Sequence, residues 1–372
     1  MKKKIFKKLY SEIIIFFLIT LFTLSAIIWI LQAVNFLDIV SEDGHSIATY
    51  FKYSGLSAAK IINETFLLSF FLALFYILVL YEENNQLLIY WTNSISKTNF
   101  LNKLILFSLL LVFISVFLSF FVVPFTQDKA RSYIRSSNLD FFPSLIKPRK
   151  FIDTVEDLTV FLDNKENQKM EKIILKDKSN NNNIQIILAK TGQIINENEN
   201  KFLILNDGKI ISTNIEKRST IFDFKETTFD LSKYNTKTTT STKIQELKSF
   251  DIINCLKNIG NQKVKDFQTF NCQENIKKEL YQEIYKRIYL PFYIVLISIL
   301  VSFLILSSHI NIDYKYNKIK IFLIGILFVV FSEMSVNMIS GDNIKNLIII
   351  SILPIISLIS YITFLNRVKF SS

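Results

Sequence analysis

Glycine is scarce in this chain, and its scarcity excludes a class of enzyme. There are 7 Gly in 372 residues, and a phosphate-binding P-loop needs the pattern Gly-x-x-x-x-Gly-Lys-Ser/Thr. The sole Gly-Lys pair, Gly208-Lys209, is followed by Ile210 and has no upstream glycine at the required spacing. The chain therefore has no nucleotide-binding P-loop of its own.

Histidine and cysteine are scarcer still. The two histidines, His45 and His309, are far apart in sequence and fall on opposite sides of the membrane in the topology predicted below. We therefore expect neither a histidine-based metal site nor a catalytic triad. The two cysteines, Cys255 and Cys272, lie in one polar block, where an oxidising compartment would allow a disulfide. Two free thiols are the alternative, and the sequence leaves both open.

Apolar residues, by contrast, are abundant. The chain is 50% hydrophobic and contains 35 Phe, more apolar surface than a soluble domain of this size usually needs. These residues gather in six runs, and a helix needs about 20 mostly apolar residues to cross a bilayer. We expect an α-helical integral membrane protein with six transmembrane helices. The predicted spans are Ile13–Val34, Leu56–Leu80, Lys103–Phe125, Ile288–Ser308, Ile321–Ile339 and Leu347–Leu365.

Basic residues set the predicted orientation of these spans. The N-terminal stretch MKKKIFKK places that end in the cytoplasm by the positive-inside rule, and Arg367 and Lys369 place the C-terminus there too. The loop Tyr81–Asn102 is then cytoplasmic and the polar block Thr126–Tyr285 lies outside. The formal charge is +11, but lysine is mixed with Asn and Ile rather than concentrated in a stripe, which argues against nucleic-acid binding.

The polar block separates two groups of three spans. We predict helices 1–3 and the cytoplasmic loop 81–102 within residues 1–125, an outer domain within 126–285, and helices 4–6 within 286–372. Helical segments are expected at Gln127–Asn138, Gln245–Leu256 and Glu274–Arg287.

Between these helical segments, short β-rich runs are separated by turn residues. Asn206-Asp207-Gly208 predicts a hairpin turn and Asn180–Asn183 a polar turn. The pattern is typical of an all-β, sandwich-like or jelly-roll-like domain. The predicted strands are Ile184–Ala189, Gln193–Ile195, Phe202–Leu205, Lys209–Ser212, Ile221–Phe224 and Thr228–Leu231.

Several short motifs follow one another in an order that resembles a known family. The helix before the fourth span carries Glu283-x-x-x-Arg287-x-x-x-Pro291, and the last span carries Ile352-Leu353-Pro354. With the outer-block motifs, these resemble the lipopolysaccharide export permeases, the F and G subunits of the Lpt machinery, over essentially the whole chain. The outer-block motifs are Ala189-Lys190-Thr191-Gly192, Leu203–Gly208, Phe222-Asp223-Phe224 and Phe229-Asp230-Leu231.

Details of the match differ along the chain. The stretch Asp38–Ser46 favours the F subunit (LptF) over the G subunit. The cytoplasmic loop departs from the family pattern, with Gln86 where a Glu is usual and Ser94 where a Gly is usual. Prolines that the family often has in the second span are absent.

The resemblance implies a non-catalytic permease subunit of an ABC transporter in the bacterial inner membrane. It implies that lipopolysaccharide is taken from the outer leaflet of that membrane and passed to a periplasmic β-jelly-roll bridge, in the service of outer-membrane biogenesis. The implied partners are an LptG-like second permease subunit, an LptB-like ATPase dimer, and LptC- and LptA-like periplasmic proteins. ATP and Mg²⁺ would be bound by the ATPase, and no cofactor by this chain.

The cytoplasmic loop is the segment implied to dock on the ATPase. In a helix, Leu87, Trp91 and Ile95 share one face with Leu88 beside them. Glu82 and Glu83 would meet basic residues of the ATPase. The alternative is a helix lying in the lipid interface, anchored by Trp91. The candidate coupling residues are Glu82, Glu83, Gln86, Leu87, Leu88, Trp91 and Ile95.

Polar residues within or beside the spans are candidates for a lipid cavity. Ionisable groups at membrane depth usually face protein or water, and basic groups near the outer mouth would bind phosphate. The alternatives are a Lys60–Glu64 pair that neutralises itself and ordinary interfacial charges. The cavity candidates are Lys52, Lys60, Glu64, Arg131, Glu333 and Asn337.

The outer domain offers a second candidate site, an apolar groove for acyl chains. Its predicted inward-facing residues are Ile186, Leu188, Leu203 and Ile210, and the alternative is a plain hydrophobic core. Two rival functions also stand beside lipopolysaccharide export. One is an ABC permease that transmits motion to its outer domain without carrying lipid, and the other is a membrane-anchored binding or scaffold protein.

Overall fold

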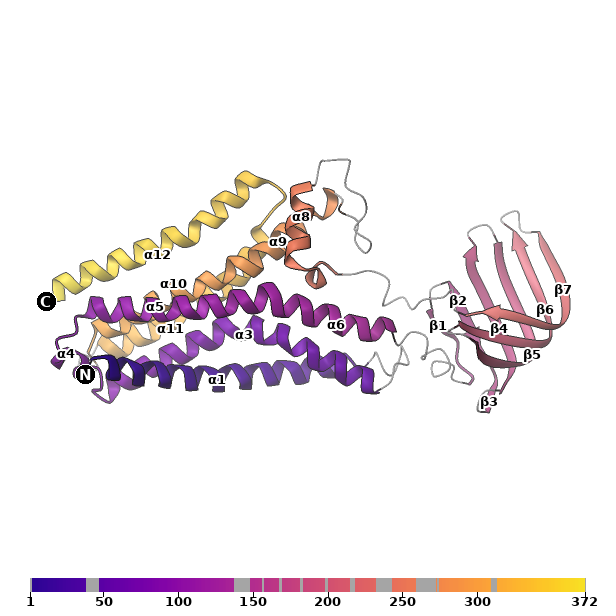
Figure 1. The fold of residues 1–372 in the computed structure, drawn as a ribbon, viewed down its shortest axis with the longest axis horizontal. Helices are drawn as coiled ribbons and strands as arrows, with labels where there is room; N and C mark the ends of the chain where they lie inside the picture. Colours follow the sequence, from indigo (N-terminus) through magenta and orange to yellow (C-terminus); the bar gives the residue numbers. More distant parts are fainter. Residues whose placement is uncertain are drawn as a thin grey trace. The chain divides into compact units, whose positions relative to one another are not determined.

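The computed structural model describes residues 2–37, 47–136, 148–155, 157–166, 169–180, 183–197, 200–214, 218–231, 243–258, 272, 274–308 and 313–371 (Figure 1). The chain forms two compact units. The first comprises Met1–Ile30, Ser57–Asp128 and Lys243–Ser372, and the second Leu31–Leu56 and Lys129–Thr242. The described residues of 243–285, which the sequence assigns to the outer domain, belong to the helical unit. The stretch Asp38–Ser46 and both histidines lie outside the described residues.

Six helical stretches are long and apolar enough to cross a membrane, so the predicted six spans are confirmed. All six helical stretches begin before the predicted apolar runs, and four of them also end beyond those runs; the fourth and fifth end one or two residues earlier. The continuous spans are Lys3–Asn35, Ile47–Glu83, Lys97–Ile134, Lys277–Leu306, Tyr314–Met338 and Asn343–Lys369. They are built from α1 (Lys2–Asn35), α3 (Ile47–Glu83), α5 (Lys97–Phe117), η1 (Leu118–Val122), α6 (Val123–Ser136), α9 (Lys277–Ile288), η4 (Leu290–Phe292), α10 (Tyr293–Ser302), η5 (Phe303–Leu306), α11 (Asp313–Met338) and α12 (Asn343–Ser371).

Two of these spans form the centre of the helical unit. In α3 and in α9–α10, 61% of the most apolar window is buried, against 17% in α11 and in α12. Phe70, Phe71 and Leu74 of α3 are almost fully buried in this core. Gly325 of α11 lies against it, and an added Cβ would come within 2.2 Å of the Phe71 ring. The outer helices therefore leave wide apolar faces uncovered, as lipid or a second subunit requires.

The described strands of the second unit form one antiparallel sheet in the order β1-β2-β4-β5-β6-β7, with β3 also paired to β4. The inserted all-β domain is confirmed, and it is built from a single sheet. Its core contains Leu175, Ile187, Leu203 and Leu205, all on one face of the sheet. The strands are β1 (Ile152–Val155), β2 (Leu158–Phe161), β3 (Asn164–Glu166), β4 (Lys169–Asn180), β5 (Asn183–Glu197), β6 (Asn200–Asn214) and β7 (Ser219–Asp230).

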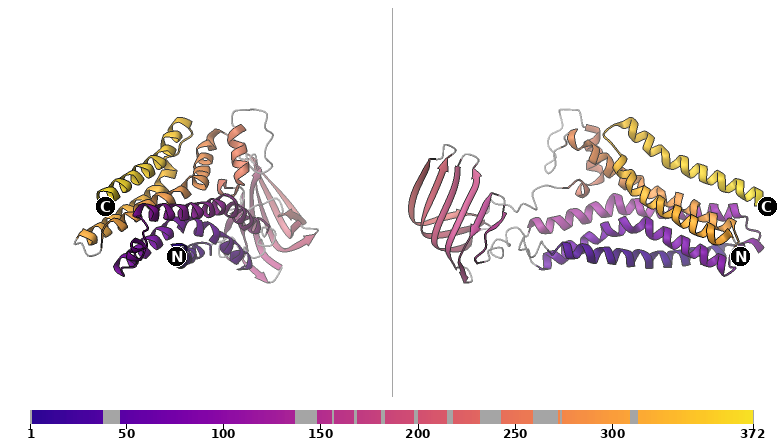
Figure 2. Two further views of the ribbon diagram at one scale, coloured as in Figure 1. Left: turned by 60° about the vertical axis from the view of Figure 1, so that its left-hand side comes forward. Right: turned by 180° about the vertical axis from the view of Figure 1, so that it is seen from behind.

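A bend crosses the sheet at one level. The ladders between β4, β5, β6 and β7 skip the pairs that Lys172, Lys190, Asp207 and Lys225 would form. Lys172 and Asp207 have positive φ angles of 51° and 50°. The register is the same on both sides of the bend, but the buried residues of β5 change from Ile187 and Ala189 to Gly192 and Ile194, so the bend switches which side chains face the core. Figure 2 shows these strands curving along their length.

The predicted hairpin turn at residues 206–208 is wrong, because the chain bends there and does not reverse. Asn206-Asp207-Gly208 lies inside β6, so each pair of predicted short strands is one long strand. Gly208 allows neighbouring strands to approach at the bend, because an added Cβ would lie 2.2 Å from the Leu188 carbonyl oxygen. The turn residues bend the strand where the sequence pattern predicted a reversal. At the predicted polar turn Asn180–Asn183, the two end residues are paired, and residues 181–182 lie outside the described part of the chain.

Candidate functional site

Arg287 is the most deeply buried charge of the helical unit that the structure describes. Its side chain is 2% exposed, and its Nε donates to Glu283 Oε1 at 2.8 Å. Nη1 donates to the Leu247 carbonyl at 2.9 Å and to Ser249 Oγ at 2.8 Å, and Nη2 donates to the Gln245 carbonyl at 3.1 Å. The guanidinium thus ties α9 to η2 (Ile244–Glu246) and α8 (Ser249–Asn258).

A π-helical turn of the third span completes this junction. In η1, a wider turn changes the hydrogen-bond register and leaves carbonyls available, as π-bulges do at many functional sites. The Ser249 hydroxyl donates to the Phe120 carbonyl at 2.6 Å, and the Ser119 hydroxyl donates to the Arg287 carbonyl at 2.7 Å. Three segments distant in sequence are therefore joined by one polar network.

A second ionic group lies beside this network, and it changes the interpretation of the Lys60–Glu64 pair. Lys286 Nζ lies 3.0 Å from Glu64 Oε1, whereas Lys60 Nζ lies 3.9 Å from it. Lys60 also donates to Gln245 Oε1 at 2.8 Å. The predicted Lys60–Glu64 pair is therefore present, but it does not neutralise itself alone, because Lys286 from α9 lies closer to the same carboxylate. Sequence spacing along one helix could not reveal Lys286, which is distant in the chain.

A small cavity lies among these groups. Its volume is about 20 Å³, and Lys60, Glu64, Lys286 and Arg287 are among its lining residues. Asn63, which also lines it, has a buried side-chain oxygen without a hydrogen-bond partner among the described residues. The space suits about one water molecule, which needs roughly 10–15 Å³. The junction is a closed polar clamp and has no room for a lipid head group.

The other cavity candidates are more exposed. Glu333 and Asn337 lie on the exposed side of α11. Glu333 is near enough to Lys286 and Glu64 to interact with both charges. In the second unit, Lys52 Nζ lies 5.0 Å from the centre of the Tyr133 ring, a cation–π distance. Arg131 is half-buried in α6.

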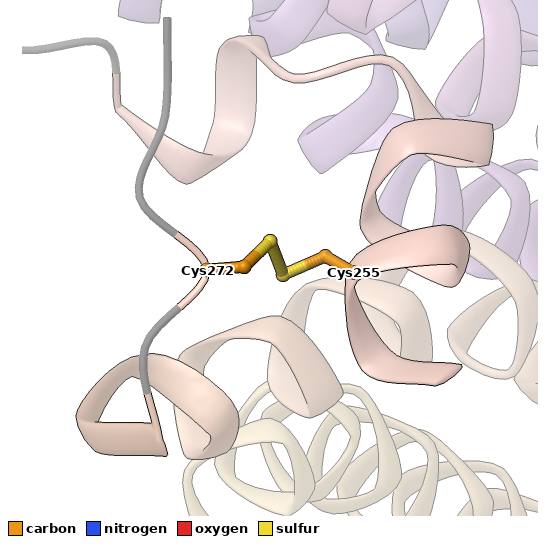
Figure 3. Close-up of a disulfide and its surroundings, with 2 residues drawn as sticks. All are labelled: Cys255 and Cys272. Carbon is orange, nitrogen blue, oxygen red and sulfur yellow. A yellow bond between two sulfur atoms is a disulfide. The ribbon is translucent and has the colours of Figure 1, made fainter. Parts of the chain in front are cut away.

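Cys255 and Cys272 are joined by a disulfide (Figure 3). Cys255 is a buried residue of α8 and packs with Ile252 and Leu280. The bridge holds α8 to the segment that leads into η3 (Glu274–Ile276) and α9. Of the two possibilities that the sequence left open, the structure has the bridge.

The loop 81–102 contains a shorter helix than predicted, α4 (Leu88–Thr92). Leu87 and Ile95 are 2% and 3% exposed, and the Trp91 ring packs on Phe100. The face predicted to meet the ATPase is therefore mostly turned into this chain's own core. Apolar spacing correctly predicted that Leu87, Trp91 and Ile95 share one face, but it could not say which protein covers that face.

The apolar surface that remains outside is formed by neighbouring residues. Leu88 is 54% exposed and Ile89 is 50% exposed. Sequence analysis missed Ile89. The adjacent aliphatic residues Leu88 and Ile89 were the feature of the sequence that could have indicated it. Tyr90 lies on the buried side of this loop. Its hydroxyl donates to the Ile5 carbonyl at 3.2 Å, and burial raises the pKa of its phenol.

The acidic coupling candidates are bound within this chain. Glu83 accepts from Lys318 Nζ at 2.8 Å, which ties the loop to α11. Glu82 is 9% exposed, so its carboxylate is not presented to solvent. Gln86 is half-buried, and its backbone N–H donates to the Tyr81 carbonyl at 2.8 Å.

The sheet holds a cavity of about 700 Å³ at its bend. Phe161, Ile174 and Leu188 occupy paired positions on one face, so their side chains form an apolar floor. The charged residues at its rim are Asp163, Lys172, Lys190, Asp207, Lys209 and Asp223.

The rim is held by ion pairs. Asp163 accepts from Lys172 Nζ at 2.7 Å and from Arg149 Nε at 3.3 Å. The hydrogen bond from Lys172, with its charge, lowers the pKa of Asp163, and the same contact raises the pKa of Lys172. On the other side, Lys209 and Asp223 lie 3.6 Å apart.

The four groove candidates divide between the two faces. Leu203 is fully buried in the core and Ile210 packs against it. Ile186 and Leu188 alternate with the core residues Ile187 and Ala189, so the prediction that they face inward is wrong. Side chains of a strand alternate between faces, and an error of one residue reverses the assignment. Leu188 instead lines the cavity at the bend.

Comparison with known proteins bears on the whole chain. An uncharacterized protein of Rickettsia prowazekii (strain Madrid E) is 23% identical over 208 residues, which cover 54% of this chain and 56% of that protein. The chain thus spans little more than half the length of this curated relative. The family model described as "Lipopolysaccharide export system permease LptF/LptG" matches residues 7–367. With six spans and an inserted β domain in the expected order, the chain belongs to the LptF/LptG lipopolysaccharide export permease family.

Proposed function

We propose that this chain is one permease subunit of an ABC-type exporter that extracts lipopolysaccharide from the outer leaflet of the bacterial inner membrane. The observation that carries this proposal is the family match across residues 7–367, which includes both the spans and the inserted sheet. The sheet would receive the lipid and pass it to LptC- and LptA-like periplasmic proteins by edge-strand pairing. β7 is the strand at one end of the described sheet and is available for such pairing.

The proposed topology has support at both sides of the membrane. Disulfides persist in oxidising compartments such as the periplasm, and Cys255–Cys272 lies beside the re-entering helix α9. The opposite ends of the spans carry Lys3, Lys4, Lys315 and Arg367, as cytoplasmic ends do. Both termini are then cytoplasmic and the sheet is periplasmic.

An external energy source is needed because acyl chains leave the bilayer. Burial of each CH₂ contributes about 0.8 kcal/mol, so lipid held in a membrane or a groove does not release itself. This chain has no P-loop. A separate LptB-like ATPase dimer would supply the work, with ATP and Mg²⁺ bound there.

Coupling to that ATPase is proposed at the loop between α3 and α5. Of the predicted residues, Leu88 offers the most exposed apolar surface, together with Ile89. Leu87, Trp91 and Ile95 would support the loop from inside, and the Glu83–Lys318 contact would transmit its movement to α11.

Leu88→Glu tests this coupling in the reconstituted complex. It should place a charge in the proposed interface and lower lipopolysaccharide release per ATP hydrolysed by about tenfold or more, since a buried unpaired charge costs several kcal/mol. Asn84→Glu adds the same charge at an exposed polar position of the loop and should leave release unchanged. Equal release by both variants would contradict docking at Leu88.

The lipid path is proposed along the exposed side of α11. Glu333 and Asn337 would face a cavity shared with an LptG-like second subunit, and Lys52 and Arg131 would bind head-group phosphates. Lys60 and Glu64 would serve the clamp around Arg287. Glu333→Leu should slow lipid extraction, whereas Met334→Leu, on the same exposed stretch, should not. Photocrosslinking to lipopolysaccharide from both positions checks the path.

Within the sheet, the proposed acyl-binding groove includes Leu203 and Ile210 on the core face. Ile186 and Leu188 mark the opposite face, where the cavity at the bend lies. A photoreactive residue at Ile210 and one at Leu188 would report which face carries lipid. Crosslinks from neither position would count against a lipid-carrying sheet.

Depletion of this chain separates export from the two rival functions. Export predicts lipopolysaccharide stranded at the inner membrane, and purification together with an ATPase and a second six-span subunit. A permease that only transmits motion would retain the ATPase and leave lipopolysaccharide at the outer membrane. A scaffold would purify without an ATPase. Assignment to the F subunit predicts that the co-purified permease resembles the G subunit.

A further inference from the structure

A hollow lined by basic and apolar residues opens between η5, α11 and α12. Its volume is about 580 Å³, within the range of about 300–1,000 Å³ that is usual for ligand sites. The proposed function assigns no role to it. Its lining residues are Leu300, Phe303, Leu306, Ser307, Asn317, Lys320, Ile321, Ile324 and Arg367.

The charge in this hollow has one sign. Lys320 and Arg367 line it, and none of the lining residues is acidic. Among the residues that the structure describes, neither cation forms a salt bridge. Arg367 lies over the Phe303 ring, with its guanidinium carbon 5.9 Å from the ring centre. Two unneutralised cations in one hollow favour an anionic ligand.

A hydroxyl in the same wall lacks a partner. Ser307 Oγ is buried and makes no hydrogen bond within the described part of the chain. A buried polar atom without a partner is unfavourable. An anionic oxygen held by the two cations would satisfy that hydroxyl.

The remaining walls are apolar and belong to membrane-spanning helices. Leu300, Ile321 and Ile324 form them, and each is only partly covered by this chain. Lys320 lies near the beginning of α11 and Arg367 near the end of α12. These helix ends lie at the same end of the helical unit as the beginning of α1 (Figure 1). The hollow therefore combines a polar, basic mouth with apolar walls at the level where a bilayer has its head groups.

We propose that this hollow binds a phospholipid with an anionic head group from the leaflet at this end of the spans. Lys320, Arg367 and Ser307 hold the phosphate, and an acyl chain lies along Leu300, Ile321 and Ile324. Basic pockets between spans are a known means of recognising anionic lipids. A free phosphate would leave the apolar walls unused, which favours the lipid. The site is distinct from the proposed path of lipopolysaccharide in the opposite leaflet.

Native mass spectrometry of the full chain, purified with its partners, tests the proposal. The probes are phosphatidylglycerol, phosphatidylcholine and inorganic phosphate, each added after delipidation. We expect retained phosphatidylglycerol and little of the other two. Lys320→Gln with Arg367→Gln should weaken binding on the order of thirtyfold, because each basic residue near a membrane surface contributes about 1 kcal/mol and 1.4 kcal/mol is tenfold.

Two further variants keep the test specific. Lys4→Gln with Lys315→Gln removes the same charge from exposed positions outside the hollow and should leave binding unchanged. Ile324→Trp keeps both cations, fills the hollow and should weaken phosphatidylglycerol binding. Three outcomes would overturn the site. Both double variants could lose phosphatidylglycerol binding equally, phosphatidylcholine could be retained as well as phosphatidylglycerol, or inorganic phosphate alone could bind. Lipid bound by the separate chain and excluded from the complex would mean that a partner protein occupies the hollow, which also overturns the proposal.

Discussion

The Arg287 guanidinium is surrounded by acceptors from α9 and from residues 245–249, and its charge is compensated by Glu283 alone among the described contacts. Burying a charge is unfavourable unless it is paired and hydrogen-bonded. The family motif Glu-x-x-x-Arg-x-x-x-Pro therefore has a physical reason here. It spaces acid and base by one helical turn, so that they meet on one side of α9.

Arg287→Met should lower the free energy of unfolding by about 3–5 kcal/mol, because it leaves Glu283 and two carbonyl groups without their partner. Chemical denaturation of the full chain in detergent measures the change. Lys278→Met, at an exposed position of the same helix, should change it by about 0.5 kcal/mol or less. Similar effects of both substitutions would show that the network contributes little.

Asp163 links stability of the sheet to pH. Its pKa in the folded chain lies below the ordinary value of 3.8 because Lys172 donates a hydrogen bond to it. The stabilisation is therefore complete above that ordinary value and is lost as the pH falls through the folded-state pKa. Asp163→Asn should speed hydrogen exchange of β2–β4 amides near neutral pH, and this difference from the unmodified chain should disappear in strong acid.

A double substitution checks that the effect comes from this pair. Once Lys172→Met is present, adding Asp163→Asn should change exchange much less than it does alone, since the principal partner is gone. If Asp163→Asn speeds hydrogen exchange as much in the presence of Lys172→Met as it does alone, the effect belongs to another contact of Asp163.

Among the elements, the long strands of the sheet owe their shape to a few backbone positions. Gly208 has the Phe224 ring and the Leu188 carbonyl on the side where a Cβ would lie, at 2.4 and 2.2 Å. A carbonyl of a paired strand cannot move aside without breaking its ladder. The glycine is therefore required for close approach of strands at the bend.

Gly208→Ala should destabilise the sheet by about 1–3 kcal/mol, the usual cost of overpacking. Gly341→Ala is the matched control, because nothing lies within 4 Å of its added Cβ. Hydrogen exchange of β5–β7 in the full chain should increase for the first variant only. Unchanged exchange at Gly208→Ala would mean that the strands separate at little cost.

The loop 81–102 shows what periodicity can and cannot predict for an element. Leu87, Trp91 and Ile95 do lie on the buried side of the loop. The sequence could not decide between a partner's groove and this chain's own core, since both are apolar. The same limit applies to Ile186 and Leu188, because an undetected bend changes which alternate residues face inward.

At the scale of the whole molecule, the proposed topology makes a separate prediction. Reporter fusions after Glu83 and after Arg367 should be active on the cytoplasmic side, and a fusion after Ile221 on the periplasmic side. The reason is the excess of basic residues at one end of the spans. A sheet reporter on the same side as Glu83 would contradict both the topology and the export proposal.

Six spans, their division into three and three, and a β-rich insertion were determined by the sequence itself, because about 20 apolar residues in a row have few other structures available. Only the tertiary structure decided that Lys286 joins Lys60 at Glu64, and that Lys320 and Arg367 share one hollow. Such pairs join residues far apart in the chain. Hydropathy and spacing are local properties, whereas burial and charge compensation depend on which helices pack side by side.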